Sequence, residues 1–113
     1  MDARVERGIA LLNEGKYYAA HDVLEDYWRP IRDDSRPFFQ GIVQIAIAMH
    51  HFSTGNLLGA QSVLLKARTN LASYPSPYSE IALNHLRSQL DDWQQAMAHG
   101  GPYPAPVHIR TGC

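Results

Sequence analysis

The stretch "HDVLEDYW" (residues 21–28) carries side chains whose types and spacing allow chemistry. His21 and Glu25 are four residues apart, so on a helix they share one face, and Trp28 lies nearly one turn further along. An imidazole beside a carboxylate can bind a metal ion or transfer a proton. The spacing therefore predicts a polar site next to an aromatic side chain.

A second polar stripe lies in the apolar stretch "FFQGIVQIAIAMHH" (residues 38–51). On a helix Gln40, Gln44 and His51 fall within about 40° of one another, with Ile47 at one edge. Polar side chains among so many apolar ones need hydrogen-bond partners or a cavity. If the two helices pack together, we expect one ligand pocket lined by His21, Glu25, Trp28, Gln40, Gln44 and His51.

Two interpretations of this polar cluster stay open. In the first, His21, Glu25 and His51 hold a divalent metal with an open coordination position, as in catalytic zinc and non-haem iron sites, or the pocket holds a small ligand. The sequence lacks both H-E-x-x-H and the paired E-x-x-H of di-iron bundles. In the second, Glu25 orients His21 within a buried hydrogen-bond network that has a purely structural role. His50, about 100° from His51, is expected to be exposed or to pack.

Glycine and proline divide the chain into five segments with helical periodicity. We predict helices over residues 3–13, 16–29, 35–53 and 57–72, and a fifth that begins at Ser76 and Pro77 and ends near residue 98. Asp2 and Ser35 are the expected N-caps of the first and third. The fold class is all-α: a compact bundle forming one domain over residues 1–98, with the apolar third helix at its centre.

An internal repeat supports this division. With an offset of forty residues, "EGKYYAAHDVLEDYWR" (14–29) aligns with "TGNLLGAQSVLLKART" (54–69), and both segments place seam residues at steps of three, four and three. Two similar helical hairpins closed by a C-terminal helix follow. His21 aligns with Gln61 and Glu25 with Leu65, so the polar pair belongs to the first hairpin alone.

These motifs resemble an uncharacterised prokaryotic and plastid family, domain of unknown function 309. The resemblance covers about residues 6–72, through "HDVLEDYWR", "FFQGIVQIAIAMHH" and "GNLLGA". Asp22 stands where the family usually has glutamate. The resemblance implies an all-helical fold and no particular activity, and it singles out His21, Glu25, Trp28, Gln40, Gly41, Gln44, His51, Asn56 and Gly59.

Composition narrows the functional classes. The formal net charge is −1, without a basic stripe, so nucleic acid is not an expected partner. The longest apolar run is well short of the roughly 20 residues that span a bilayer. The ordinary balance of 45% hydrophobic and 19% charged residues predicts a chain that folds as a monomer or small homo-oligomer. The single cysteine and an N-terminus without a signal-peptide pattern favour the cytoplasm. The Pro- and Gly-rich tail, residues 99–113, is expected to be extended and loose, unless it lies over the bundle or docks on a partner.

The sequence therefore leaves two functions open. As an enzyme or ligand carrier, the protein would use Glu25 as a ligand or acid/base group, and His21 and His51 as ligands or proton carriers. As a protein-interaction module, it would use a groove of a helical hairpin and expose an apolar patch. The first hairpin has His21 and Glu25 where the second has Gln61 and Leu65. This difference slightly favours a ligand or metal site in the first hairpin, because a protein that serves only as a scaffold does not need the polar pair.

Overall fold

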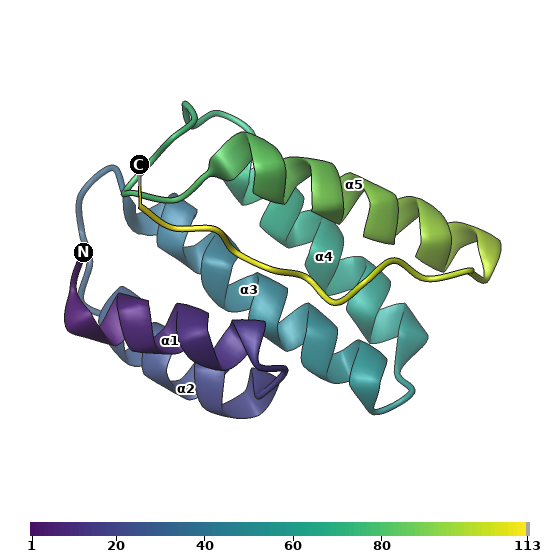
Figure 1. The fold of residues 1–113 in the computed structure, drawn as a ribbon. Coiled ribbons are helices and arrows are strands. Elements are labelled where there is room, and N and C mark those ends of the chain that lie inside the picture. The colour runs from purple at the N-terminus through teal and green to yellow at the C-terminus, as the bar shows by residue number, and fades with distance from the viewer. Residues whose placement is uncertain (113) are drawn as a thin grey trace.

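A central helix, α3 (Arg36–Ser53), organises the molecule in the computed structural model, which describes residues 1–112. Helices α2 and α4 pack against α3, α1 packs on α2, and α5 packs on α4 (Figure 1). The bundle is all-α with two helical hairpins and a closing helix, as predicted. The other helices are α1 (Ala3–Asn13), α2 (Tyr17–Trp28), α4 (Leu57–Leu71) and α5 (Leu83–His99).

The predicted repeat is a structural repeat as well. In the first hairpin turn, the Lys16 amide donates to the Leu11 carbonyl at 2.9 Å; forty residues on, the Asn56 amide donates to the His51 carbonyl at 2.8 Å. Each turn contains a left-handed glycine, with φ of 81° at position 15 and 85° at position 55. The hairpins α1–α2 and α3–α4 are therefore two copies of one design.

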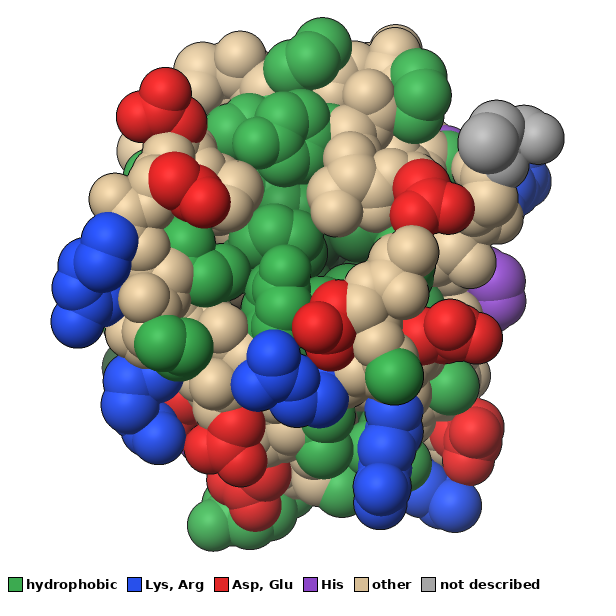
Figure 2. Space-filling view, turned by 90° about the vertical axis from the view of Figure 1, so that its left-hand side faces the viewer, with side chains coloured by type: hydrophobic (Ala, Val, Ile, Leu, Met, Phe, Trp, Pro, Cys, Tyr) green, Lys and Arg blue, Asp and Glu red, His purple; other side chains and the backbone are tan. Residues whose placement is uncertain are grey.

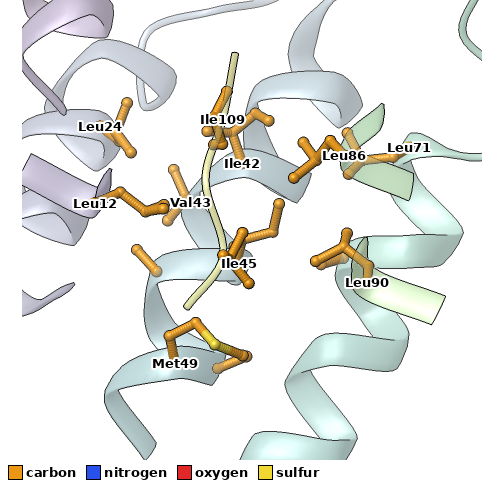
Figure 3. Close-up of a cluster of buried hydrophobic side chains, with 14 of the residues drawn as sticks. Leu12, Leu24, Ile42, Val43, Ile45, Met49, Leu71, Leu86, Leu90 and Ile109 are labelled. Carbon is orange, nitrogen blue, oxygen red and sulfur yellow. The ribbon is translucent and has the colours of Figure 1, made fainter. Parts of the chain in front are cut away.

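Apolar side chains from all five helices form one core (Figure 3). The repeat predicts two matching seams, Tyr17, Ala20, Leu24 and Tyr27 on α2 and Leu57, Ala60, Leu64 and Ala67 on α4. The alanines and leucines at 20, 24, 60, 64 and 67 are buried, and Tyr17, Tyr27 and Leu57 are partly buried against the same core. The alternating steps of three and four residues on the fifth helix predict a further seam, and all five of its side chains are buried: Leu83, Leu86, Leu90, Trp93 and Met97. Close helix contacts depend on glycine: a Cβ at Gly8 would lie 2.4 Å from the Leu24 Cγ, and one at Gly41 would lie 2.9 Å from the Leu71 Cγ.

Two cap predictions have different outcomes. The Asp2 side chain accepts from the Arg4 amide at 2.8 Å, which confirms it as the N-cap of α1. Ser35 occupies the N-cap position of α3 but makes no capping bond with its side chain. Its hydroxyl donates instead to Asp33, whose Oδ1 also accepts from the Ser35 amide at 2.8 Å. These two bonds hold the pKa of the Asp33 carboxyl below its ordinary value.

The predicted start of the fifth helix at Ser76 is wrong, because α5 begins at Leu83. Ser79 and Glu80 have φ of 48° and 62°, in the left-handed region that an α-helix excludes. This bend buries Ile81 completely. The Ser76 hydroxyl oxygen still accepts from the Asn84 amide at 2.9 Å and so satisfies a donor in the first turn of α5.

The expected loose tail is instead packed on the bundle. It runs back as an extended chain between α1 and α5 (Figure 1), and Val107 and Ile109 are each 1% exposed. At the end of the molecule that carries the N-terminus, hydrophobic side chains lie in a hollow bordered by charged ones (Figure 2). Within the described residues, no helix combines the length and apolar character needed to cross a membrane.

Candidate functional site

One side of the α2–α3–α4 layer faces away from the tail, and we call it the open face. On α3, Ile42, Ile45 and Met49 belong to the core with the tail residue Ile109 (Figure 3), whereas Gln40 and Ile47 lie about 180° around the helix. Two depressions lie along this outer stripe. The α2-side depression, of about 160 Å³, is lined by Tyr18, His21, Ile47 and His50; the α4-side groove is lined by Gln40, Gln44, Leu65, Lys66, Thr69 and Asn70.

The predicted pair of His21 and Glu25 makes direct contact on α2. The Glu25 Oε2 lies 2.9 Å from the His21 Nε2, and the Glu25 Oε1 accepts from the Arg29 Nη2 at 2.5 Å. The His21 Nδ1 lies 3.5 Å from the Asp22 carboxylate. The imidazole is therefore fixed between two carboxylates. The His21 and Glu25 side chains are 23% and 32% exposed, so this network lies at the surface and not in the core.

The histidine of α3 that lines the depression with His21 is His50. Its ring centroid lies 5.6 Å from that of Tyr18, which is 6.1 Å from the His21 ring. His51 instead lies at the hairpin turn, where its Nδ1 is 3.4 Å from the Asn56 Nδ2. From the sequence, His50 was expected to be a packing or exposed residue because it projects 100° away from His51. In the structure it lies on the flank of α3 that faces α2, beside Tyr18.

The predicted glutamines lie in the α4-side groove. The Gln44 Oε1 accepts from the Asn70 Nδ2 at 2.8 Å, and Gln40 lines the same groove. The six predicted pocket residues are thus distributed along the open face and not gathered around one point. Among residues 1–112, no group of three or more His, Cys, Asp and Glu side chains is placed to hold a metal ion. His21, Glu25 and His51 accordingly do not form one ligand set in this structure.

Trp28 is held by a residue that sequence reasoning missed. The Arg36 guanidinium lies over the indole ring, 4.2 Å from its centroid. Its Nη1 also donates to the carbonyls of Ile31, Arg29 and Trp28 at 2.7, 3.1 and 3.3 Å. Arg36 thereby satisfies carbonyls at the C-terminal end of α2. The spacing of eight residues from Trp28 across a proline-containing loop gave no sequence signal for this contact.

The open face exposes three large apolar side chains. Tyr18 is 63% exposed, Leu58 80% and Leu65 58%. The repeat offset of forty aligns Tyr18 with Leu58, so α2 and α4 present apolar side chains at equivalent positions on either side of α3. Leu58 and Leu65 are seven residues apart and share one face of α4. The sequence contained a signal for the exposure of Leu58 and Leu65, since both leucines fall outside the predicted buried seam of this helix.

Comparisons with known proteins confirm the family resemblance of the sequence motifs. The sequence profile of a family described as "Domain of unknown function (DUF309)" matches residues 5–63. An uncharacterised protein of Aquifex aeolicus (strain VF5) is 27% identical over 100 residues, which are 88% of this chain and 30% of that protein. The uncharacterised protein YpuF of Bacillus subtilis (strain 168) is 26% identical over 72 residues, 63% of this chain and 41% of that protein. The matched residues thus span less than half the length of each of these curated relatives.

Proposed function

The chain belongs to the DUF309 family, and from the side chains on its open face we propose that it is a protein-interaction module that binds an amphipathic helix. The observation that carries this proposal is the exposure of Tyr18, Leu58 and Leu65. Tyr18 lines the α2-side depression with His21, and Leu65 lines the α4-side groove with Gln40 and Gln44. Large exposed apolar side chains flanked by polar ones are typical of binding surfaces. A helix is the proposed partner because helices that dock into grooves present apolar anchors three, four or seven residues apart, a spacing that matches the seven residues between Leu58 and Leu65.

Charge defines the proposed partner further. The α2 side of the open face carries three acidic side chains, Asp22, Glu25 and Asp26. Between residues 22 and 29 the only basic side chain is Arg29, so this stretch has a net negative charge. The Asp22 and Asp26 side chains are 60% and 69% exposed, so they are available to a partner. We propose a basic residue on the partner helix that enters the depression beside His21, where the Tyr18 ring offers a cation–π contact. The apolar stripe of the partner would cover Leu58 and Leu65.

A display selection tests this proposal directly. A library of amphipathic helical peptides is selected against the wild-type protein, with counter-selection against Leu58→Glu/Leu65→Glu. Both leucines are exposed, so this variant is expected to keep its fold. Enriched peptides should carry a basic residue beside the apolar stripe and should bind the variant at least tenfold more weakly by fluorescence anisotropy.

A matched control places the same two charges elsewhere. Ser88→Glu/Ala98→Glu alters exposed positions on α5 and should leave peptide binding unchanged. Peptides that bind the Leu58→Glu/Leu65→Glu variant as tightly as the wild type would overturn the proposal. A selection that enriches no peptide over the counter-selected variant would overturn it as well.

A further inference from the structure

Two grooves meet at α4, and the side chains of Leu65 and Thr69 line both of them. The first is the α4-side groove, which lies between α3 and α4. The second lies between α4 and α5, has a volume of about 360 Å³ and is lined by Leu65, Arg68, Thr69, Ala72 and Arg87. We call it the α4–α5 groove. A helix whose apolar stripe covers Leu65 therefore has this second groove along one flank.

Every charged side chain that lines these two grooves is basic. Lys66 lines the α4-side groove, and Arg68 and Arg87 line the α4–α5 groove. A carboxylate lies next to one of them: the Asp91 Oδ1 on α5 accepts from the Arg68 Nη2 at 3.0 Å. Within residues 1–112, Lys66 and Arg87 form no ion pair, so the α4 side of the open face has a net positive charge.

Both guanidinium groups of the α4–α5 groove have N–H donors left for an anion. A guanidinium carries five such donors. Arg87 uses its Nη1 on the carbonyls of Leu71 and Tyr74, at 3.0 and 2.8 Å, and its Nη2 on the Asn84 Oδ1 at 2.6 Å. These bonds immobilise Arg87 before any ligand arrives, which lowers the entropic cost of binding. Arg68 uses one donor, on the carboxylate of α5. A carboxylate is a suitable ligand for such a pair of guanidinium groups.

The two sides of the open face therefore carry opposite charge. Asp22, Glu25 and Asp26 make the α2 side negative, whereas the α4 side is positive. Helices α2 and α4 pack on either side of α3 (Figure 1), so at the usual interaxial distance their axes are about 16–20 Å apart. A helix with its side chains is about 10–12 Å wide, so long charged side chains on its two flanks can meet both sides.

We propose that the partner helix carries acidic side chains on the flank that faces the α4–α5 groove, and that the opposite charges of the open face fix the direction of this helix along α4. The inference rests on the proposed function and adds a carboxylate site to it. An amphipathic helix has one flank on each side of its apolar stripe, and turning the helix end to end exchanges them. A helix with one basic and one acidic flank thus pairs opposite charges on both sides in one direction only. In the other direction like charges face each other, which costs affinity.

Two synthetic peptides of equal composition test the direction. Both repeat leucine at steps of three and four residues. The first has arginines on one flank and glutamates on the other, and the second has these flanks exchanged. Each peptide carries a benzophenone at its N-terminus, and the residues that it labels on irradiation are mapped by mass spectrometry. One peptide should label residues 54–58, at the start of α4, and the other residues 69–74, at its end. Labelling of the same end by both peptides would overturn the proposal.

The variant Arg68→Gln tests the carboxylate site. It should weaken the binding of both peptides by about threefold to tenfold in fluorescence anisotropy, because it removes one guanidinium from the groove. It should not weaken peptides in which glutamine replaces every glutamate. The matched control, Arg110→Gln, removes an exposed guanidinium from the tail, on the other side of α3, and should leave binding unchanged. Equal weakening of the glutamate and glutamine peptides would contradict the assigned role of Arg68.

The same peptides separate this inference from the proposed function. Peptides that bind Arg68→Gln as tightly as the wild type, but lose binding to Leu58→Glu/Leu65→Glu, would retain the interaction module and overturn the carboxylate site alone. Peptides that fail to bind the wild-type protein would overturn both.

Discussion

Replacing Glu25 by glutamine should cost little stability, and this expectation decides between a structural and a binding role for the polar pair. The carboxylate makes two contacts on its own helix: 2.9 Å to the His21 Nε2 and 2.5 Å to the Arg29 Nη2. Exposed pairs at i,i+4 contribute about 0.3–0.5 kcal/mol each. Because the three side chains are 23%, 32% and 62% exposed, the full loss is about 1 kcal/mol or less.

Urea and thermal denaturation of Glu25→Gln beside the wild type measure this loss. For a domain of this size, about 1 kcal/mol lowers the Tm by roughly 3–6 °C. The matched control is Asp26→Asn, which removes one carboxylate on the same helix that contacts only Arg29, at 3.4 Å. A loss above roughly 3 kcal/mol would refute the reasoning, because only a desolvated network contributes that much.

The same samples address function. If the open face binds a basic helix, Glu25→Gln should retain the fold and weaken the selected peptides, while Asp26→Asn should weaken them less. Elemental analysis of the two samples also tests the sequence-based metal prediction, since a metal bound through Glu25 would be lost in the variant.

Three further predictions concern the scaffold. Gly8→Ala should lower the free energy of unfolding by about 1–2 kcal/mol, because the clash 2.4 Å from the Leu24 Cγ outweighs the gain in helix propensity; Ala10→Gly on the same helix is the propensity control. Arg36→Ala should cost about 2–3 kcal/mol in urea denaturation, and Arg36→Lys should recover less than half, since an ammonium cannot both bind three carbonyls and stack on Trp28. Because the pKa of Asp33 is lowered in the folded state, its ionised carboxylate stabilises the fold at pH values above the ordinary pKa of an aspartate. This contribution disappears as the pH falls through the folded-state pKa. The difference in unfolding free energy between wild type and Asp33→Asn should therefore be constant above about pH 5 and shrink below it. A difference that stays constant down to pH 2 would contradict this cause.

Local patterns predicted most of the fold. On the first helix, Val5, Ile9 and Leu12 recur at steps of four and three residues, a spacing that predicts a buried face, and all three are buried. The seam of α5 was predicted in the same way, because helical periodicity is set by residues close in sequence. The start of α5 failed for a long-range reason. The cap-plus-proline pattern at Ser76 is a valid local signal, but burial of Ile81 and its pairing with Thr111 override it.

The sequence predicted which side chains of the candidate site lie together on one helix, but not which side chains of neighbouring helices they meet. The contact between His21 and Glu25 followed from their spacing within one helix. The proximity of His50, and not His51, to Tyr18 depends on how α2 lies across α3, and no residue spacing within either helix encodes that relation. The packed tail was missed because Val107 and Ile109 alternate with polar residues and prolines, so their fit to a distant channel had no local signature.

The position of α3 has a mechanical consequence. One side of this helix forms the floor of the open face and the other supports the tail, so a single helix of about 10 Å in diameter is the whole partition between them. A close-packed interior transmits strain and does not absorb it. A displacement of α3 that widened the grooves of the open face would narrow the space that the tail occupies. The shapes of the two surfaces are therefore coupled through the position of this one helix.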